Sequence, residues 1–253
     1  MPRNGVHVDE ESSGGWGEFA ARLCAHPGCA GPADVLYAVR HGQSTTNAGL
    51  RPATVAEADD MAIGLTELGR RQATAVGRWL VTLEPDAAPD LVLCSPYLRA
   101  VQTWRLAARE LRVAGRPLPC HDIDVRLYDR YRGDFSHLPA TVVRERFPEE
   151  YTKEQADPLG YRPPGGESFR DVAQRLRGVV ARIEGDRRHR RVLIVAHDAV
   201  VLFLRQLLEK LTDTEILAIT AAGLVGNASV TQWERDARGY RLLAYDERAH
   251  LPR

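Results

Sequence analysis

Two short, strongly apolar segments of this chain each end at a histidine, and this arrangement limits the fold more than any other feature. Val35-Leu-Tyr-Ala-Val39 runs into Arg40 and His41, and Val192-Leu-Ile-Val-Ala196 runs into His197. An apolar run of about five residues between polar residues is typical of a strand buried on both faces of a parallel sheet. Because ligands bind at the carboxyl ends of strands in open α/β sheets, both histidines are predicted to lie at a ligand site.

Strands and helices are expected to alternate along the rest of the chain. Ser95 fits an N-cap with Pro96 at the first helical position, and Ser168 with Asp171 resembles a capping box. Further strands are expected at 91–94, 123–127, 229–233 and 241–245, and helices after Thr66, Pro96 and Ser168 and over 200–211 and 213–221. This pattern predicts an α/β fold, a three-layer sandwich whose mostly parallel central sheet carries helices on both faces. The segment 128–164 is expected to form a lid-like insertion.

The chain divides into an N-terminal extension and one large domain. Residues 1–33 are rich in Gly, Ser and acidic side chains and are expected to be partly disordered, whereas 34–253 is long enough for one α/β domain. Cys24, His26 and Cys29 are potential zinc ligands in the extension. A structural zinc site needs four ligands, so a plain surface extension is preferred and no metal is expected.

Charge and hydropathy exclude several classes of partner. The 34 Lys and Arg residues balance 34 Asp and Glu residues, so no overall field attracts nucleic acid or an anionic membrane. No segment approaches the roughly 20 apolar residues of a membrane span, which favours a cytoplasmic protein. The oligomeric state stays open, and the sequence is compatible with a homodimer.

The residues at the strand ends favour phosphate chemistry. Arginine offers a permanently charged fork suited to phosphate, as at Arg40, and histidine is a nucleophile or proton carrier near neutral pH, as at His41. Arg99 follows the expected strand 91–94 near the start of a helix, where backbone donors also favour an anion. Since no carboxylate cluster with metal-ligand spacing is apparent, arginines would supply the positive charge that phosphoryl transfer needs, with no cofactor.

Five motifs in order carry a family resemblance. They are Arg40-His-Gly-Gln-Ser44 with Asn47, Leu65-Thr-Glu-Leu-Gly-Arg-Arg-Gln-Ala73, Ser95-Pro-Tyr-Leu-Arg-Ala-Val-Gln-Thr103, Pro164-Gly-Gly-Glu-Ser168 and Val195-Ala-His197. This set resembles the histidine phosphatase superfamily, also called phosphoglycerate mutase-like, over residues 34 to 245.

The resemblance implies a mechanism and a set of site residues. His41 would attack phosphorus and form a phosphohistidine that water hydrolyses. Arg40, Arg99 and His197 would stabilise the transferred group. Further substrate-binding residues are expected at Gln43, Ser44, Asn47, Arg130 and Arg162, of which the two arginines could equally be plain surface residues.

The family's acid block is altered here. The family takes the proton for the leaving group from a glutamate in a Leu-x-Glu-x-x-x-Gly block, which reads Leu127-Tyr-Asp-Arg-Tyr-Arg-Gly133 and puts Asp129 at the acid position. Aspartate is one methylene shorter, and Asp122, Asp124 and Asp134 are alternatives. His197 is followed by Asp198 where many relatives have glycine, and this residue is expected to cap the next helix.

These observations predict a metal-independent phosphatase that hydrolyses a small-molecule phosphomonoester, so its partner would be a small phosphorylated metabolite. One alternative is a phosphoglycerate-mutase-like phosphotransferase, although the long block that mutases carry after the acid is missing. Another is a non-catalytic protein that only binds phosphorylated ligands. The altered acid block favours such a binder, whereas the pairing of a second histidine with a nucleophilic one disfavours it.

Overall fold

The computed structural model describes residues 33–50, 60–136 and 138–252. The expectations for the N-terminal extension, including Cys24 and Cys29, therefore lie outside the described residues apart from Ala33. The described chain builds a six-stranded sheet of order β3-β2-β4-β1-β5-β6. The strands are β1 Val35–Arg40, β2 Leu91–Cys94, β3 Cys120–Ile123, β4 Arg191–Ala196, β5 Val230–Asp236 and β6 Gly239–Glu247.

The sheet is mostly parallel, as predicted, because β1 to β4 run in one direction, whereas β5 pairs antiparallel with β1 and β6 pairs antiparallel with β5. Every residue of β2 is buried, and β1 and β4 are buried from their second residue onward. This burial explains why these strands read as continuous apolar runs rather than as alternating ones.

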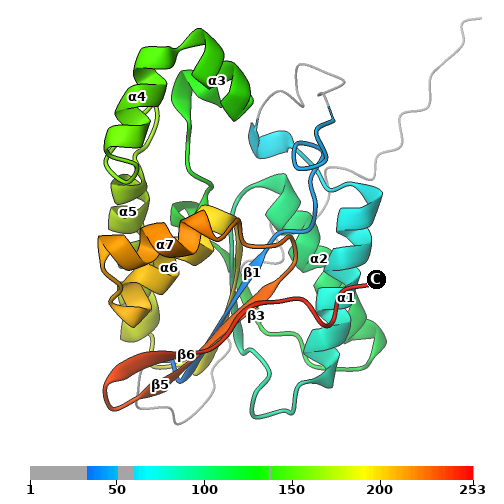
Figure 1. Cartoon of the computed structure of the whole chain (residues 1–253). Coiled ribbons are helices and arrows are strands. Elements are labelled where there is room, and N and C mark those ends of the chain that lie inside the picture. The colour runs from blue at the N-terminus through cyan, green and yellow to red at the C-terminus, as the bar shows by residue number, and fades with distance from the viewer. Residues whose placement is uncertain (1–32, 51–59, 137, 253) are drawn as a thin grey trace, which may run out of the picture.

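Helices cover both faces of the sheet (Figure 1), which confirms the three-layer architecture. On one face, α1 Glu67–Thr82 and α2 Leu98–Val113 pack through a core that contains Val76, Leu80 and Trp104. On the other, α5 Phe169–Gly185 and α6 Asp198–Glu209 pack through a core that contains Leu176 and Leu204, with α7 Asp213–Ala221 beside α6. None of the described helices is long and apolar enough to cross a membrane.

Helix starts follow the local capping chemistry in most places. The Thr66 side chain accepts a hydrogen bond from the Gly69 amide at the start of α1, and Ser168 and Asp171 form the predicted capping box of α5. The expectation that Ser95 caps α2 is wrong. The N-cap is Tyr97, and the Ser95 hydroxyl instead lies 2.8 Å from His197 Nε2.

Other boundaries also differ from the prediction, and β5 and β6 extend past the expected carboxyl ends of 229–233 and 241–245. The third strand ends at Ile123 because the Asp124 side chain accepts a hydrogen bond from the Arg126 amide and turns the chain into a 3-10 helix, Val125–Leu127. Helix α6 begins at Asp198, two residues earlier than expected, directly after His197.

The insertion between β3 and α5 contains the short helices α3 Ala140–Arg146 and α4 Pro148–Ala156, which stand beyond the carboxyl end of the sheet (Figure 1). Its base is closed by tight backbone contacts. Gly133 has φ +55°, and a Cβ there would lie 2.0 Å from the Pro164 carbonyl oxygen. The Asp134 amide donates to that same oxygen at 3.0 Å, so only glycine fits at position 133.

Candidate active site

The strand register brings three strand ends together. Arg40 of β1 pairs with Ala196 of β4, and Cys94 of β2 pairs with Val195. The backbone amides of His41 and Ser95 continue these ladders, each donating at 2.9 Å to a β4 carbonyl. As a result the His41 and His197 rings lie 5.1 Å apart between centroids, and both side chains are buried.

The hydrogen bonds of His41 assign its tautomer. Its Nδ1 donates to the Gly42 carbonyl at 2.7 Å, so the lone pair lies on Nε2, which accepts from Arg99 Nε at 3.2 Å. Burial lowers the pKa of His41 well below its usual value, and His197, Arg99 and Arg40 lower it further. His41 is therefore neutral, and its Nε2 carries the unprotonated lone pair that a nucleophile requires.

Two buried arginines supply the positive charge. Arg40 lies at the end of β1 and donates to the Val225 carbonyl, whereas its Nε has no hydrogen-bond partner among the described residues. Arg99 lies in the first turn of α2 with its guanidinium 4.6 Å from the centre of the Tyr97 ring. Both side chains are buried, where their charges are screened less than at the surface.

Carboxylates occupy the outer nitrogens of Arg99. One terminal nitrogen donates to Asp60 Oδ1 at 3.0 Å and to the Asp60 carbonyl at 2.7 Å, and the other donates to Asp129 Oδ2 at 3.0 Å. Phosphate would need these same donors. Binding a phosphate group therefore requires at least one of the two carboxylates to move.

Asp129 lies between Arg99 and His197. Its Oδ2 is 3.3 Å from His197 Nδ1 without forming a hydrogen bond, and its Oδ1 accepts from the Arg130 amide at 2.8 Å. Burial lowers the pKa of His197 well below its usual value, with Arg99 and Arg40 adding to the effect, so this ring is neutral as well.

The alternatives to Asp129 are not part of this cluster. Asp122 and Asp124 both pair with Arg182 of α5, and Asp134 is exposed. Asp198 instead lies next to the site, as the first residue of α6 directly after His197. Burial raises its pKa, the charge of Asp129 raises it further and Arg40 opposes the shift, while Oδ1 accepts from the Ala199 amide at 2.9 Å.

The polar residues after His41 form a hydrogen-bonded loop. Asn47 Oδ1 accepts from the Ser44 amide and from Asn227 Nδ2, and the same Asn227 nitrogen donates to the His41 carbonyl at 3.1 Å. Gln43 holds the start of α1, because its carbonyl accepts from the Thr66 amide and its side-chain oxygen accepts from the Thr66 hydroxyl. The structure thus places Ser44 and Asn47 beside His41 and ties Gln43 to the neighbouring helix.

Two expected substrate residues lie elsewhere. Arg130 is largely buried, stacks at 4.0 Å on the Phe169 ring and donates to the Glu167 carbonyl. Arg162 is exposed and pairs with Asp171 at 2.7 Å. The Arg130 amide bonds Asp129, but neither arginine side chain contacts the catalytic cluster within the described residues, so a substrate contact of these side chains stays a prediction.

Sequence reasoning did not find three residues of this site. Asp60 bonds Arg99 across 39 positions of sequence, and Asn227 reaches His41 from the loop before β5. Ser95 was assigned to a helix cap instead of to His197. No local pattern marks Asp60 or Asn227, because their partners come from other segments of the chain.

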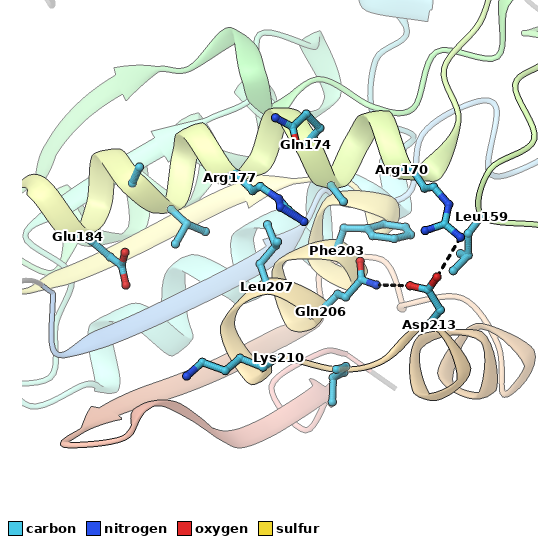
Figure 2. A pocket seen from close by; sticks show the side chains of 14 residues that line it. Leu159, Arg170, Gln174, Arg177, Glu184, Phe203, Gln206, Leu207, Lys210 and Asp213 are labelled. Carbon is cyan, nitrogen blue, oxygen red and sulfur yellow. Dashed lines mark hydrogen bonds and ion pairs between the residues drawn. The ribbon is translucent and has the colours of Figure 1, made fainter.

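Two cavities bear on where a ligand could enter. The largest of the described cavities, about 670 Å³, lies between α5, α6 and the start of α7 (Figure 2), and neither histidine lines it. Its Asp213 binds Arg170 and Gln206. A second cavity of about 600 Å³ includes Asp60 and Tyr97 and so adjoins the catalytic cluster. Within the described ranges, no group of three or more His, Cys, Asp or Glu side chains is placed to hold a metal ion.

The site thus combines a neutral strand-end histidine, a second histidine and two buried arginines at the end of an α/β sheet. The model of the histidine phosphatase superfamily (branch 1) matches residues 36–248. The chain belongs to this superfamily.

The similar proteins include one named as a mutase and others named as phosphatases. A 2,3-bisphosphoglycerate-dependent phosphoglycerate mutase of Chelativorans sp. (strain BNC1) is 32% identical over 192 residues, 74% of this chain and 87% of the mutase. A mycobacterial glucosyl-3-phosphoglycerate phosphatase, solved with VO3, has a TM-score of 0.66 and 29% identity and covers 85% of this chain and all of its own. The α-ribazole phosphatase from Shigella flexneri has a TM-score of 0.67 and 25% identity, over 85% and 97% of the two chains.

Proposed function

We propose that this chain is a phosphatase that hydrolyses a small-molecule phosphomonoester through a phosphohistidine at His41. The observation that carries the proposal is the neutral His41 ring, whose Nε2 lone pair lies beside the Arg99 guanidinium. The nucleophilic nitrogen of His41 and the positive charge of Arg99 therefore lie next to each other before the substrate binds.

In the first step, His41 Nε2 attacks phosphorus and the bond from phosphorus to the ester oxygen breaks. Arg40 and Arg99 neutralise the phosphoryl oxygens, and His197 is close enough to donate to one of them. Asp129 lies beside Arg99 and His197. When the substrate phosphate takes its place on Arg99, Asp129 takes up the proton of the phosphate monoanion and passes it to the leaving oxygen.

In the second step, a water attacks the phosphohistidine and Asp129 takes the proton of that water. Phosphate leaves and the His41 lone pair is restored. The arginines provide the charge that a metal ion supplies in other phosphoryl-transfer sites, so we expect the reaction to proceed without a metal.

The test is phosphate release from a panel of phosphorylated metabolites with a chelator present, with wild type and His41→Ala compared. We expect turnover by wild type and at least a thousandfold loss in the variant, which lacks the nucleophile. Turnover that persists in His41→Ala would place the nucleophile elsewhere, and strong inhibition by the chelator would contradict the metal-free mechanism.

A transferase is the second candidate, because the similar protein of Chelativorans is named a mutase. The two activities differ in what accepts the phosphoryl group. If isotope-labelled phosphohistidine at position 41 is discharged by a second phosphorylated metabolite and not by water, the protein is a transferase.

A further inference from the structure

The cavity of about 600 Å³ beside the catalytic cluster has a composition that selects among phosphomonoesters. It is continuous with the catalytic residues. The Tyr97 ring on its wall lies 4.9 Å from the His197 ring, and Asp60 on the same wall bonds Arg99. An ester whose phosphorus faces His41 therefore extends its alcohol part into this cavity.

Tyrosine rings and small apolar side chains make up much of the cavity wall. Tyr128 and Tyr131 join Tyr97, and Val125 and Met61 add apolar surface. Val125 and Tyr131 are exposed, at 67% and 49% of their full surface, so they can contact a ligand without rearrangement of the core. Such a wall favours a group with an apolar face, because aromatic rings bury large apolar areas in fixed orientations.

Glu167 holds two of these tyrosines in position. Its Oε1 accepts from the Tyr128 hydroxyl and from Arg175 Nε, and its Oε2 accepts from the Tyr131 amide and from Arg175. These four hydrogen bonds use the acceptor sites of the carboxylate. Glu167 is therefore a positioning residue, and the neighbouring Arg175 balances its charge.

No described Arg or Lys side chain on this wall is placed to bind a second anion. Its charged side chains among the described residues are the carboxylates Asp60 and Glu167, and no described Arg or Lys lines it. A carboxylate or second phosphate on the alcohol part would lose water there without gaining an ion pair, because Arg99 and Arg175 are already paired with Asp60 and Glu167.

We propose that the substrate's alcohol part carries no negative charge and has an apolar ring or chain face that lies against Tyr128 and Tyr131. This proposal rests on the proposed function of the same site and narrows it to one class of phosphomonoester. It also disfavours phosphoglycerates, whose carboxylate would enter the cavity.

The test uses substrate pairs that differ by one carboxylate. We compare kcat/KM for glycerol 3-phosphate with 3-phosphoglycerate, and for sorbitol 6-phosphate with 6-phosphogluconate, because in each pair a CH2OH group is replaced by a carboxylate. The uncharged member of each pair is expected to be favoured by about tenfold or more. Equal or reversed preference in both pairs would overturn the proposal.

Two matched variants test whether the selectivity against the carboxylate arises at this cavity wall. Val125→Arg adds a cation to the cavity wall and is expected to improve kcat/KM for the carboxylate-bearing member of each pair relative to its partner. Val113→Arg makes the same change at a valine that is 76% exposed at the end of α2, outside the cavity, and should leave the ratio unchanged. Equal ratios in Val125→Arg and wild type would contradict the assigned position of the alcohol part.

Binding separates this proposal from the proposed function. The same four esters are titrated calorimetrically into His41→Ala, which cannot form a phosphohistidine. If no substrate is hydrolysed by wild type but the uncharged esters still bind more tightly, hydrolysis is refuted and the selectivity of the cavity stands. Tighter binding of the anionic esters would overturn the selectivity whatever the hydrolysis assay shows.

Discussion

At the scale of single residues, the chemistry of this site depends on which atoms hold protons. The backbone carbonyl of Gly42 directs the His41 proton to Nδ1, and burial together with nearby positive charge keeps both histidines neutral. Asp60, Asp129 and Asp198 carry carboxyl groups at or near the cluster. Asp129 contacts Arg99 and His197 directly, whereas Asp198 has a pKa raised by burial and by the charge of Asp129.

Asp129→Asn is expected to slow hydrolysis of alkyl phosphates by about a hundredfold or more, because a poor leaving group needs a proton from the acid. Hydrolysis of p-nitrophenyl phosphate should fall much less, since its leaving group is stable as an anion. Steady-state kcat for both substrates measures the difference. Asp198→Asn is the matched control, and a stronger leaving-group dependence in that variant would make Asp198 the proton donor.

At the scale of secondary-structure elements, the strands and helix starts hold the reactive groups in position. Helix α1 can approach the His41 loop because Gly69 has no side chain, and a Cβ there would lie 2.1 Å from the Gln43 carbonyl oxygen. The 3-10 helix Asp60–Ala62 lies against α2 and places the Asp60 carboxylate on Arg99. The Asp60 carboxylate of this 3-10 helix thereby competes with the substrate phosphate for Arg99.

Asp60→Asn is expected to tighten binding of inorganic phosphate by about threefold to tenfold, because the competing charge on Arg99 is removed. The measurement is the inhibition constant of phosphate in the hydrolysis assay, supported by calorimetry. Glu145→Gln removes one charge from an exposed position on α3 and should leave the constant unchanged. Weaker phosphate binding in Asp60→Asn would show that Asp60 orients Arg99 instead of competing for it.

At the scale of the whole molecule, the fold is stable enough to bury a positively charged cluster at the carboxyl end of its sheet. Arg40, Arg99 and the two histidines are all at most 7% exposed. The histidines bind protons in the unfolded chain below a pH of about 6.5 but stay neutral in the folded protein. Their contribution to stability is therefore present above this pH and is lost as the pH falls.

The melting temperature is accordingly expected to fall between pH 7.5 and pH 5.5, and the fall should be smaller in His41→Asn, which has one such group fewer. Each pKa unit of depression is worth about 1.4 kcal/mol at full protonation of the unfolded chain. Inorganic phosphate should raise the melting temperature at both pH values, since it binds only the folded state. Scanning calorimetry gives all these quantities, and an unchanged pH dependence in His41→Asn would contradict the neutral His41.

Much of this protein could be predicted from local patterns. The buried strands, the capping box at Ser168 and the positions of Arg40, His41, Arg99 and His197 at strand and helix ends follow from the sequence, because hydrophobic period and capping depend on residues within a few positions of one another. The order of the motifs indicated the family of the chain, and the family resemblance predicted that these residues share one site.

Only the tertiary structure decided which groups meet across the chain. In the structure Ser95 hydrogen-bonds His197 instead of capping a helix, Asp60 pairs with Arg99, and Asn227 donates to the His41 carbonyl. The Arg130 side chain stacks on Phe169 and does not reach the two histidines. These contacts join segments up to 186 positions apart. Their physical basis is the packing of the sheet and its covering helices, and no local propensity encodes it.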